Sequence, residues 1–508
     1  MNIGNESLVV KTKSSYLNVK AIILCVFVGA INSFFYDDVA IMLALCVVEI
    51  ACLVWCLFRR EYISYIAYYT VFLCFSMESL GSGGVAGSDF FYGFKNFHVG
   101  GLNLAVWVLI PLVVVSLCKT SYLFSNIGSL HRKILVGLVF FTFTCGIMGL
   151  ITYLVDDNGF SSQSGSMRVL IGCYYSYVLP LLEILAVSFC VVFQKSKISM
   201  LKEYLYSIIV STAIVFVLCL AFKNYGRIGG LESLQVSEVY FLLVCSLCLL
   251  CYDDFNFQSK VVLGVSGVVI LVLSLAYNAS GKIVIITVLI PIIMAIVVFK
   301  QGHAVKTILM LFVGCFVLFG LLSFLLPLLR EKSMLLSIKY EQAMKMLSFS
   351  SDNWFDNIPS SPRMRIAEFL DIAEEYIYKP WFAFWGKGFG GTVVDRLKIF
   401  TDVDEFAFSR WELNLGAFYS MHESVNNFFL VGGLFGLYTI ISLTIRIFGA
   451  IHLSPWLVFG VVWIFLFYNY HSTIGIYGIV SLVVGLEDVH EYNLNTIKLE
   501  VAKEHGCR

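Results

Sequence analysis

Charged residues are scarce in this chain of 508 residues: only 13% are Asp, Glu, Lys or Arg, whereas 59% are hydrophobic. This balance excludes an ordinary soluble domain and is typical of a protein that crosses a membrane many times. Basic and acidic residues also cancel, so no net charge would attract nucleic acid. We therefore expect an all-α polytopic membrane protein with no nucleic-acid partner.

Cysteine is absent from the longest polar segment, residues 329–424, although the chain has 15 cysteines. A disulfide therefore cannot crosslink this segment. Cys245, Cys248 and Cys251 are closely spaced, but no His or further Cys accompanies them in register, which favours small helix-packing residues over a metal site. Internal repeats and inverted pairs of broken helices are also lacking, which argues against a secondary transporter. We expect no metal and no cofactor.

Apolar runs occupy most of the chain, and a membrane helix needs ~20 residues. There are fourteen runs: 20–35, 38–58, 62–80, 101–118, 134–155, 169–193, 204–222, 238–252, 260–278, 283–299, 306–328, 425–445, 453–469 and 473–487. The run at 238–252 and the last two runs are short enough to be tilted, packed or partly re-entrant. The expected organisation is a tail at 1–19, a bundle of about 11 helices at 20–328, a large loop at 329–424, about 3 helices at 425–487 and a tail at 488–508.

Lys and Arg in the short connections set the expected orientation. With a cytoplasmic N-terminus, eighteen basic residues fall on the inside and five on the outside, namely Lys95, Arg168, Lys223, Arg227 and Lys282. No small-residue cleavage site clearly follows the first apolar run, so we expect it to be retained as a helix. Both tails are then cytoplasmic. The large loop faces the periplasm of a bacterium, and the protein lies in the inner membrane.

The large loop is too long to be structureless, and its pattern predicts a helix. Ser361 is a suitable cap with Pro362 at the first helical position, and Lys379-Pro380 ends the helix. Apolar residues follow at helical spacing: Met364, Ala367, Leu370, Ala373 and Ile377. One face is polar: Glu368, Asp371, Glu374 and Glu375.

Arg363 and Arg365 fall in the first turn of this helix, where backbone N–H groups and the helix dipole favour an anion. Cations at this position are unfavourable for the helix itself, which indicates an external phosphate or carboxylate. A surface pair bonded to a nearby acid such as Glu368 explains them equally well.

A glycine-rich turn, Gly386 to Gly391, includes Lys387 and follows Trp385. Glycine allows the backbone to approach a ligand closely, although most such turns are only turns. Aromatic residues such as Trp385 can stack on sugars or lie at the bilayer interface. We take Lys387 and Trp385 as candidate substrate-binding residues.

His422 and Glu423 precede the next apolar run, and Asn426 and Asn427 lie within its first turn. A His beside a carboxylate can accept a proton from a hydroxyl group, and the two Asn side chains can orient sugar or phosphate oxygens. The alternative is a helix that Ser424 caps, with polar residues facing other helices. Lys282, Arg168 and Arg227 end other outside connections and either meet the same site or anchor their helices at the interface.

The order of these motifs resembles the O-antigen polymerase and O-antigen ligase superfamily over residues 275–440. The motifs are Ser280-Gly281-Lys282, then Arg363 or Arg365 with Pro380 and Gly386 to Gly390, then His422 with Asn426, and Gly433-Leu434-Phe435-Gly436. Two positions differ from the ligase pattern: Glu423 follows His422 where a ligase has Asn, and Lys282 stands where Arg is common. These differences favour the polymerase.

The resemblance implies a metal-independent inverting glycosyltransferase of the GT-C type. It would transfer a growing glycan from undecaprenyl pyrophosphate to the terminal sugar of a lipid-linked repeat unit. Arg363 and Arg365, with Lys282, Arg168 and Arg227, would bind the pyrophosphate, and His422 or Glu423 would act on the acceptor. A separate length-controlling partner is also implied. The alternatives are a ligase that transfers glycan to lipid A core and, from another class, a lipid-linked oligosaccharide flippase or transporter.

Overall fold

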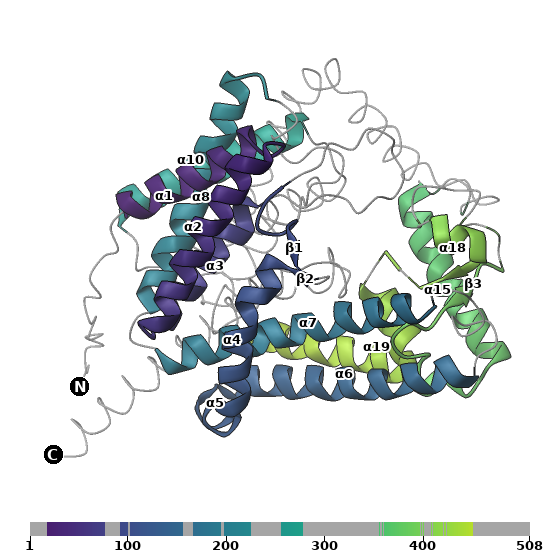
Figure 1. The fold of residues 1–508 in the computed structure, drawn as a ribbon. Coiled ribbons are helices and arrows are strands. Elements are labelled where there is room, and N and C mark those ends of the chain that lie inside the picture. Colours follow the sequence, from purple (N-terminus) through teal and green to yellow (C-terminus); the bar gives the residue numbers. More distant parts are fainter. Residues whose placement is uncertain are drawn as a thin grey trace, which may run out of the picture.

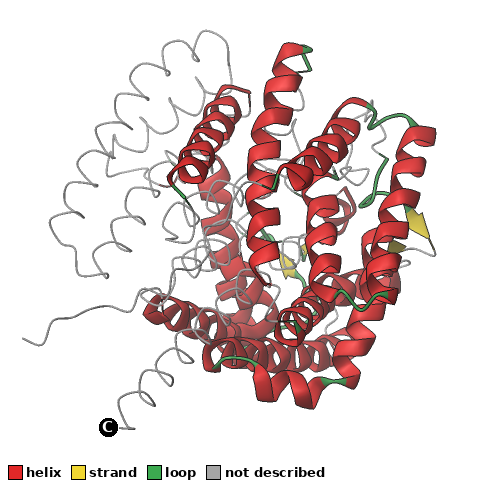
Figure 2. Ribbon diagram, turned by 90° about the vertical axis from the view of Figure 1, so that its left-hand side faces the viewer, coloured by secondary structure: helices red, strands yellow, loops and turns green. Residues whose placement is uncertain are grey.

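A computed structural model describes residues 18–76, 92–99, 102–155, 166–194, 198–224 and 256–277; between 355 and 450 it describes 355, 358, 360–396, 398, 400, 408, 410–419, 421, 422 and 424–450. These residues are almost entirely helical, as expected (Figure 2). The helices are α1 (Val19–Phe34), α2 (Val39–Phe58), α3 (Tyr62–Phe75), α4 (Leu104–Cys118), α5 (Thr120–Asn126), α6 (Ser129–Val155), α7 (Ser166–Phe193), α8 (Ile198–Ala221), α10 (Phe257–Tyr277), α15 (Ser360–Tyr378), α16 (Phe382–Trp385), α18 (Arg410–Leu415) and α19 (Ser424–Ala450).

Two short antiparallel ladders complete the described structure. Strand β1 (His98–Val99) pairs with β2 (Leu102–Asn103), and β3 (Val393–Val394) pairs with β4 (Ala417–Phe418). The second ladder joins two parts of the large loop, because Val393 lies opposite Phe418.

Six described helices are long and apolar enough to cross a membrane: α2, α6, α7, α8, α10 and α19. Helices α4 and α5 would together form one more span with a bend of 78°, and α1 and α3 are shorter apolar helices. Nine of the fourteen expected runs are therefore helices. The other five, 238–252, 283–299, 306–328, 453–469 and 473–487, lie outside the described residues. A multi-pass membrane protein is supported, while the count of fourteen and the orientation stay predictions.

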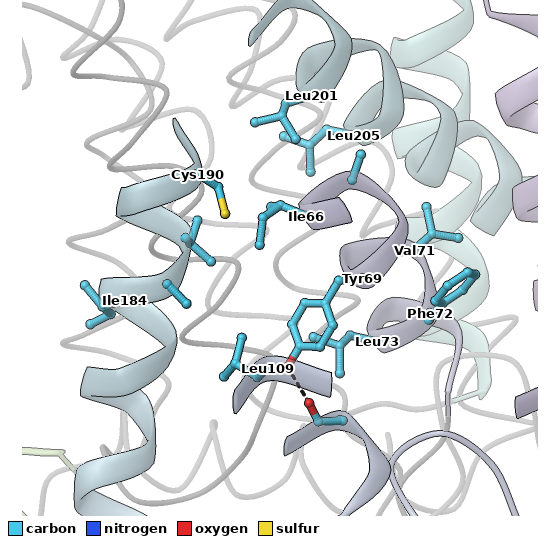
Figure 3. Packing of buried hydrophobic residues seen from close by; sticks show 14 of the residues in the cluster. Ile66, Tyr69, Val71, Phe72, Leu73, Leu109, Ile184, Cys190, Leu201 and Leu205 are labelled. Carbon is cyan, nitrogen blue, oxygen red and sulfur yellow. Dashed lines mark hydrogen bonds between the residues drawn. The ribbon is translucent and has the colours of Figure 1, made fainter. Parts of the chain in front are cut away.

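The first bundle is built around α3, which α1, α2, α7 and α8 surround (Figure 1). Twelve of its 14 residues are buried, which accounts for a sequence that is apolar on all sides. Ile66 and Tyr69 pack among residues of α4, α7 and α8 (Figure 3). The hydroxyl of Tyr69 donates to the carbonyl of Ala105 at 3.3 Å, so this polar atom is paired inside the bundle.

Helices α6, α7 and α19 form the second part of the bundle, with α6 packed against the other two (Figure 1). Phe141 of α6 stacks on Phe428 of α19 at 4.3 Å, and the hydroxyl of Tyr174 in α7 donates to the carbonyl of Gly146. The carboxyl end of α6 therefore lies at the same end of the bundle as the amino ends of α7 and α19. Helix α15 packs against α19 at this end.

Candidate functional site

Helix α15 forms where the sequence predicts it. It begins at Ser360, one residue before the expected cap, has Pro362 in its first turn and ends at Tyr378, directly before Lys379-Pro380. Proline is tolerated here because the first-turn N–H groups have no partner within the helix.

The polar face of α15 points into the protein. Glu368, Asp371 and Glu375 are fully buried. The predicted apolar stripe is divided, because Met364 and Ala367 are buried whereas Leu370 and Ile377 are exposed. On a water-soluble protein, the acids of an amphipathic helix are normally on the exposed side. Buried carboxylates require hydrogen-bonded or charged partners, so polar and charged side chains from other elements are expected beside this face of α15.

Glu368 joins α15 to the start of α19 through His422 and Asn426. The Nδ1 atom of His422 contacts Oε1 of Glu368, and the backbone N–H of His422 donates to both carboxylate oxygens at 3.2 Å. Asn426 Nδ2 donates to Oε2 of Glu368 at 2.8 Å and to the carbonyl of Arg365 at 2.9 Å. Three donors thus fix the carboxylate in one orientation.

This arrangement fixes the histidine ring as well. A carboxylate that accepts from Nδ1–H selects the tautomer in which Nε2 carries the lone pair. The His422 side chain is 30% exposed, while that of Glu368 is fully buried. His422 can therefore exchange a proton with a ligand at the surface while the buried carboxylate stabilises the imidazolium ion.

Arg363 and Arg365 lie on the same helix as Glu368, within about one turn of it. Both side chains are partly buried, and the Nε atom of each lies inside the protein. Arg365 is linked to this cluster through its backbone, because its carbonyl accepts from Asn426 Nδ2. The sequence raised Glu368 only as a partner for these arginines; its bonds to His422 and Asn426 were not predicted.

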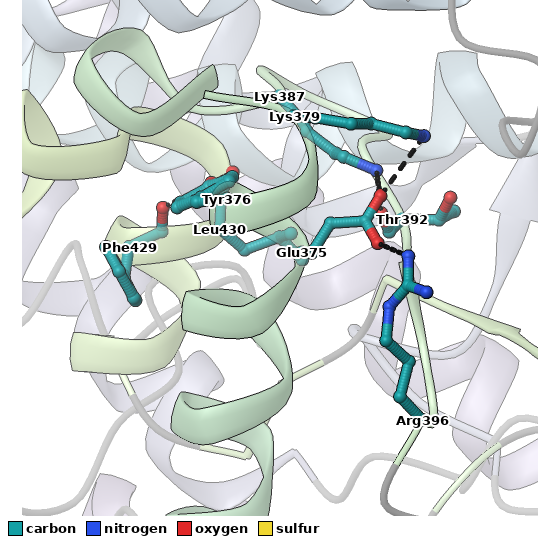
Figure 4. A network of polar contacts seen from close by, with 8 residues as sticks. All are labelled: Glu375, Tyr376, Lys379, Lys387, Thr392, Arg396, Phe429 and Leu430. Carbon is teal, nitrogen blue, oxygen red and sulfur yellow. Dashed lines mark hydrogen bonds and ion pairs between the residues drawn. The ribbon is translucent and has the colours of Figure 1, made fainter. Parts of the chain in front are cut away.

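A second buried acid, Glu375, binds three cations at the other end of α15 (Figure 4). Its carboxylate lies 2.7 Å from Lys387 Nζ, 2.8 Å from Arg396 Nη2 and 3.1 Å from Lys379 Nζ. Burial alone would raise the pKa of the Glu375 carboxyl, but the charge of Lys387 and the hydrogen bonds from Lys387 and Arg396 lower it from 4.5 to about 2. The carboxylate is therefore ionised at neutral pH.

Lys387 has a different role from the direct substrate contact predicted for it. Its side chain is fully buried, and Nζ donates to Glu375 and, at 2.7 Å, to the carbonyl of Thr392. The ammonium group ties the glycine-rich turn to the end of α15. Lys387 thus supports the loop from inside.

The glycine-rich turn is inserted between α6 and α19. Phe389 is buried and stacks on Tyr177 of α7 at 4.4 Å, and its N–H donates to the carbonyl of Cys145 in α6 at 3.1 Å. Gly388 has a φ of +69°, and a Cβ atom there would lie 1.9 Å from the backbone nitrogen of Gly149. The close approach that glycine allows is therefore to a membrane helix.

The inserted turn supplies hydrogen-bond donors at a break in α19. The helix is interrupted at Gly433, where φ is 56° and ψ is −143°, so carbonyls one turn earlier lose their partners within the helix. Those carbonyls accept hydrogen bonds from other elements. The Tyr376 hydroxyl of α15 lies 2.8 Å from the Phe429 oxygen and 2.7 Å from the Leu430 oxygen. In the glycine-rich turn, the N–H of Lys387 donates to Leu430 and that of Gly388 donates to Val431, both at 2.9 Å. A broken helix in a membrane requires such substitutes.

Two other candidates, Asn427 and Trp385, contact other parts of the helix bundle. Asn427 is fully buried; its Nδ2 donates to the carbonyl of Met421 at 2.9 Å and its Oδ1 accepts from the Tyr177 hydroxyl at 3.4 Å. The ring centres of Trp385 and Phe435 lie 5.9 Å apart, and Phe435 is eleven residues, or about 16 Å, along α19 from Ser424. Asn426 contacts Glu368, whereas substrate binding by Asn427 and Trp385 stays a prediction.

The remaining candidates complete the comparison. Arg168 lies in the first turn of α7, at the same end of the bundle as α15. Glu423, Lys282 and Arg227 lie outside the described residues.

Among the residues that the structure describes, no group of three or more His, Cys, Asp or Glu side chains is placed to bind a metal ion. Comparison of the chain with models of known families and with characterised proteins found no match.

Proposed function

We propose that this protein is a polymerase of O-antigen or a related surface polysaccharide in the inner membrane of a bacterium. It transfers a growing glycan from undecaprenyl pyrophosphate to the terminal sugar of a lipid-linked repeat unit. The observation that carries the proposal is the pairing of the partly exposed His422 with the buried Glu368, on the helix that also carries Arg363 and Arg365. This combination suits an acid–base reaction on an anionic substrate.

The proposed reaction needs one base and one site for a leaving diphosphate. His422 Nε2 accepts the proton of the acceptor hydroxyl as its oxygen bonds to the anomeric carbon of the donor sugar. The bond from that carbon to the diphosphate oxygen breaks, and the diphosphate leaves with the electron pair. Attack from the opposite face inverts the anomeric configuration, and Glu368 stabilises the imidazolium ion that forms.

The arginines bind the leaving group in this scheme. A guanidinium group can donate two parallel hydrogen bonds to phosphate oxygens, which lysine cannot do. Replacing Arg365 with Lys should therefore abolish chain elongation although the charge is kept. Polysaccharide from cells that carry R365K shows this on a gel, with protein level as the control. Normal polymer length would remove Arg365 from the site.

Reconstitution tests the proposal directly. Purified protein in proteoliposomes should convert lipid-linked repeat units into a ladder of longer chains without added metal or nucleotide. The H422Q variant, reconstituted at the same level, should leave the repeat units unchanged. Repeat units that move across the membrane without growing would identify a transporter and reject the proposal.

Deletion of the protein separates the polymerase from the ligase, which uses the same donor. Cells without a polymerase attach single repeat units to the lipid A core, whereas cells without a ligase accumulate free polymer on the carrier. We expect single repeat units. The proposed partners are the undecaprenyl-linked oligosaccharide and a separate regulator of chain length.

A further inference from the structure

The outer face of α15 and α16 is apolar and exposed, although it belongs to the loop expected in the periplasm. Five neighbouring side chains, between 49% and 78% exposed, form this outer face: Ile377, Tyr378, Trp381, Phe384 and Trp385. Phe369 and Leu370 extend it along α15. Exposing an apolar surface of this kind to water is unfavourable, so such a patch indicates a site that binds a protein or a membrane.

The outer face is continuous with a surface that belongs in lipid. Trp385 of α16 contacts Phe435 of α19, a helix apolar enough to span a membrane. Leu434 and Tyr438, which lie on either side of Phe435 in the sequence of α19, are exposed. The apolar surface of the span therefore extends onto the loop.

The depth of α16 supports the same partner. Lys387 and Gly388, just after α16, donate to the carbonyls of Leu430 and Val431, which lie six and seven residues inside α19. At 1.5 Å per residue, this is about 10 Å below the start of the span. A helix held at this depth cannot lie in bulk water if α19 crosses the bilayer.

Charges lie at the edge of the outer face. The guanidinium carbon of Arg396 lies 4.4 Å from the centre of the Tyr378 ring, and Lys379 follows that tyrosine in the chain. Aromatic side chains flanked by cations are typical of the boundary between acyl chains and phosphate headgroups.

We infer that the outer face of α15 and α16 is inserted in the outer leaflet of the bilayer, with lipid as its partner. The exposed apolar side chains of α15 then contact lipid, while its buried acids face the protein. The inference stands without the proposed glycosyl transfer. If that transfer occurs, insertion places the site beside the headgroups, where the diphosphate of a lipid carrier lies.

Photo-crosslinking in proteoliposomes tests this insertion. We would place benzoylphenylalanine at Phe384, at Ile377 and, as the control, at the exposed Asn414 of α18. Mass spectrometry should find phospholipid adducts at positions 384 and 377 and none above background at 414. Absence of lipid adducts at 384 and 377, or crosslinks there to a second copy of the chain, would overturn the inference.

Fluorescence provides a second measurement that does not depend on those substitutions. Phospholipids brominated along the acyl chain should quench the emission that is lost in the W381F/W385F double variant, because α16 lies about 10 Å below the start of the span. Equal emission in brominated and ordinary lipids would overturn the inference, whether or not the protein elongates glycans.

Discussion

Glu368 and Glu375 are buried acids on one helix, but their partners give them different roles. Glu368 binds an imidazole ring and an amide, and the imidazole reaches the surface. Glu375 binds Lys387, whose side chain is fully buried, together with Arg396 and Lys379. The first pair can transfer a proton to a ligand, whereas the second holds the loop together.

Replacing Glu368 with Gln should lower the turnover rate of the proposed reaction by about 100-fold or more, because the carboxylate orients His422 and stabilises its charged form. The Michaelis constant should change little if Glu368 acts only through His422. Kinetics of the reconstituted protein measure both quantities. Glu374→Gln, which changes an acid of the same helix, is the control and should retain activity.

Glu375 should make the protein sensitive to acid. Its pKa is lowered in the folded state, to about 2, so its contribution is fully present above its ordinary value of 4.5 and is lost as the pH falls towards 2. The difference corresponds to roughly 3 kcal/mol. Thermal unfolding of the purified protein should show a loss of stability in this range.

The Glu375→Gln variant serves as the comparison. It should be less stable than the natural protein at pH 7, because Lys387 loses its buried counter-charge. Its melting temperature should also depend less on pH between 4.5 and 2. An equal pH dependence in both proteins would show that another group is responsible.

At the scale of elements, the glycine-rich turn and the break in α19 depend on each other. The turn supplies N–H donors to carbonyls that the break releases. The insertion in turn requires glycine, since a Cβ at position 388 would overlap the backbone of α6.

Gly388→Ala and Gly416→Ala form a matched pair that tests this fit. Both glycines have a positive φ, +69° and +63°, so alanine costs about 1–3 kcal/mol of backbone strain in each. A Cβ at Gly416 meets nothing within 4 Å, whereas at Gly388 it overlaps Gly149. Overpacking should add about 1–3 kcal/mol or more to the first variant alone. Equal melting temperatures for the two variants would show that the turn does not need this close contact.

At the scale of the whole molecule, local patterns in the sequence predict the helices well. The bounds of α15 follow from Pro362 and from Lys379-Pro380, and the nine apolar helices follow from long runs. The sequence also places Asn426 one turn after His422, where it donates to Glu368, although the role predicted for it is substrate binding.

Other features depend on contacts between distant residues and could not be predicted. Glu368 and His422 are 54 residues apart, and no local pattern joins them. The burial of Lys387 could not be predicted either, because the glycine-rich turn that contains it enters the helix bundle and its Nζ pairs with Glu375.

The side of the membrane on which α15 lies decides whether a lipid carrier can reach the site from the periplasm. Two exposed residues can test this orientation: Asn414 of α18 and Lys133 at the start of α6. They lie at opposite ends of the part of the bundle that α6, α7 and α19 form (Figure 1). In intact spheroplasts a membrane-impermeant maleimide should label Asn414→Cys, and it should label Lys133→Cys only after permeabilisation. The unsubstituted protein measures the background from native cysteines such as the exposed Cys118. The reverse labelling pattern would place His422 and Glu368 in the cytoplasm, where a periplasmic polymerase cannot act.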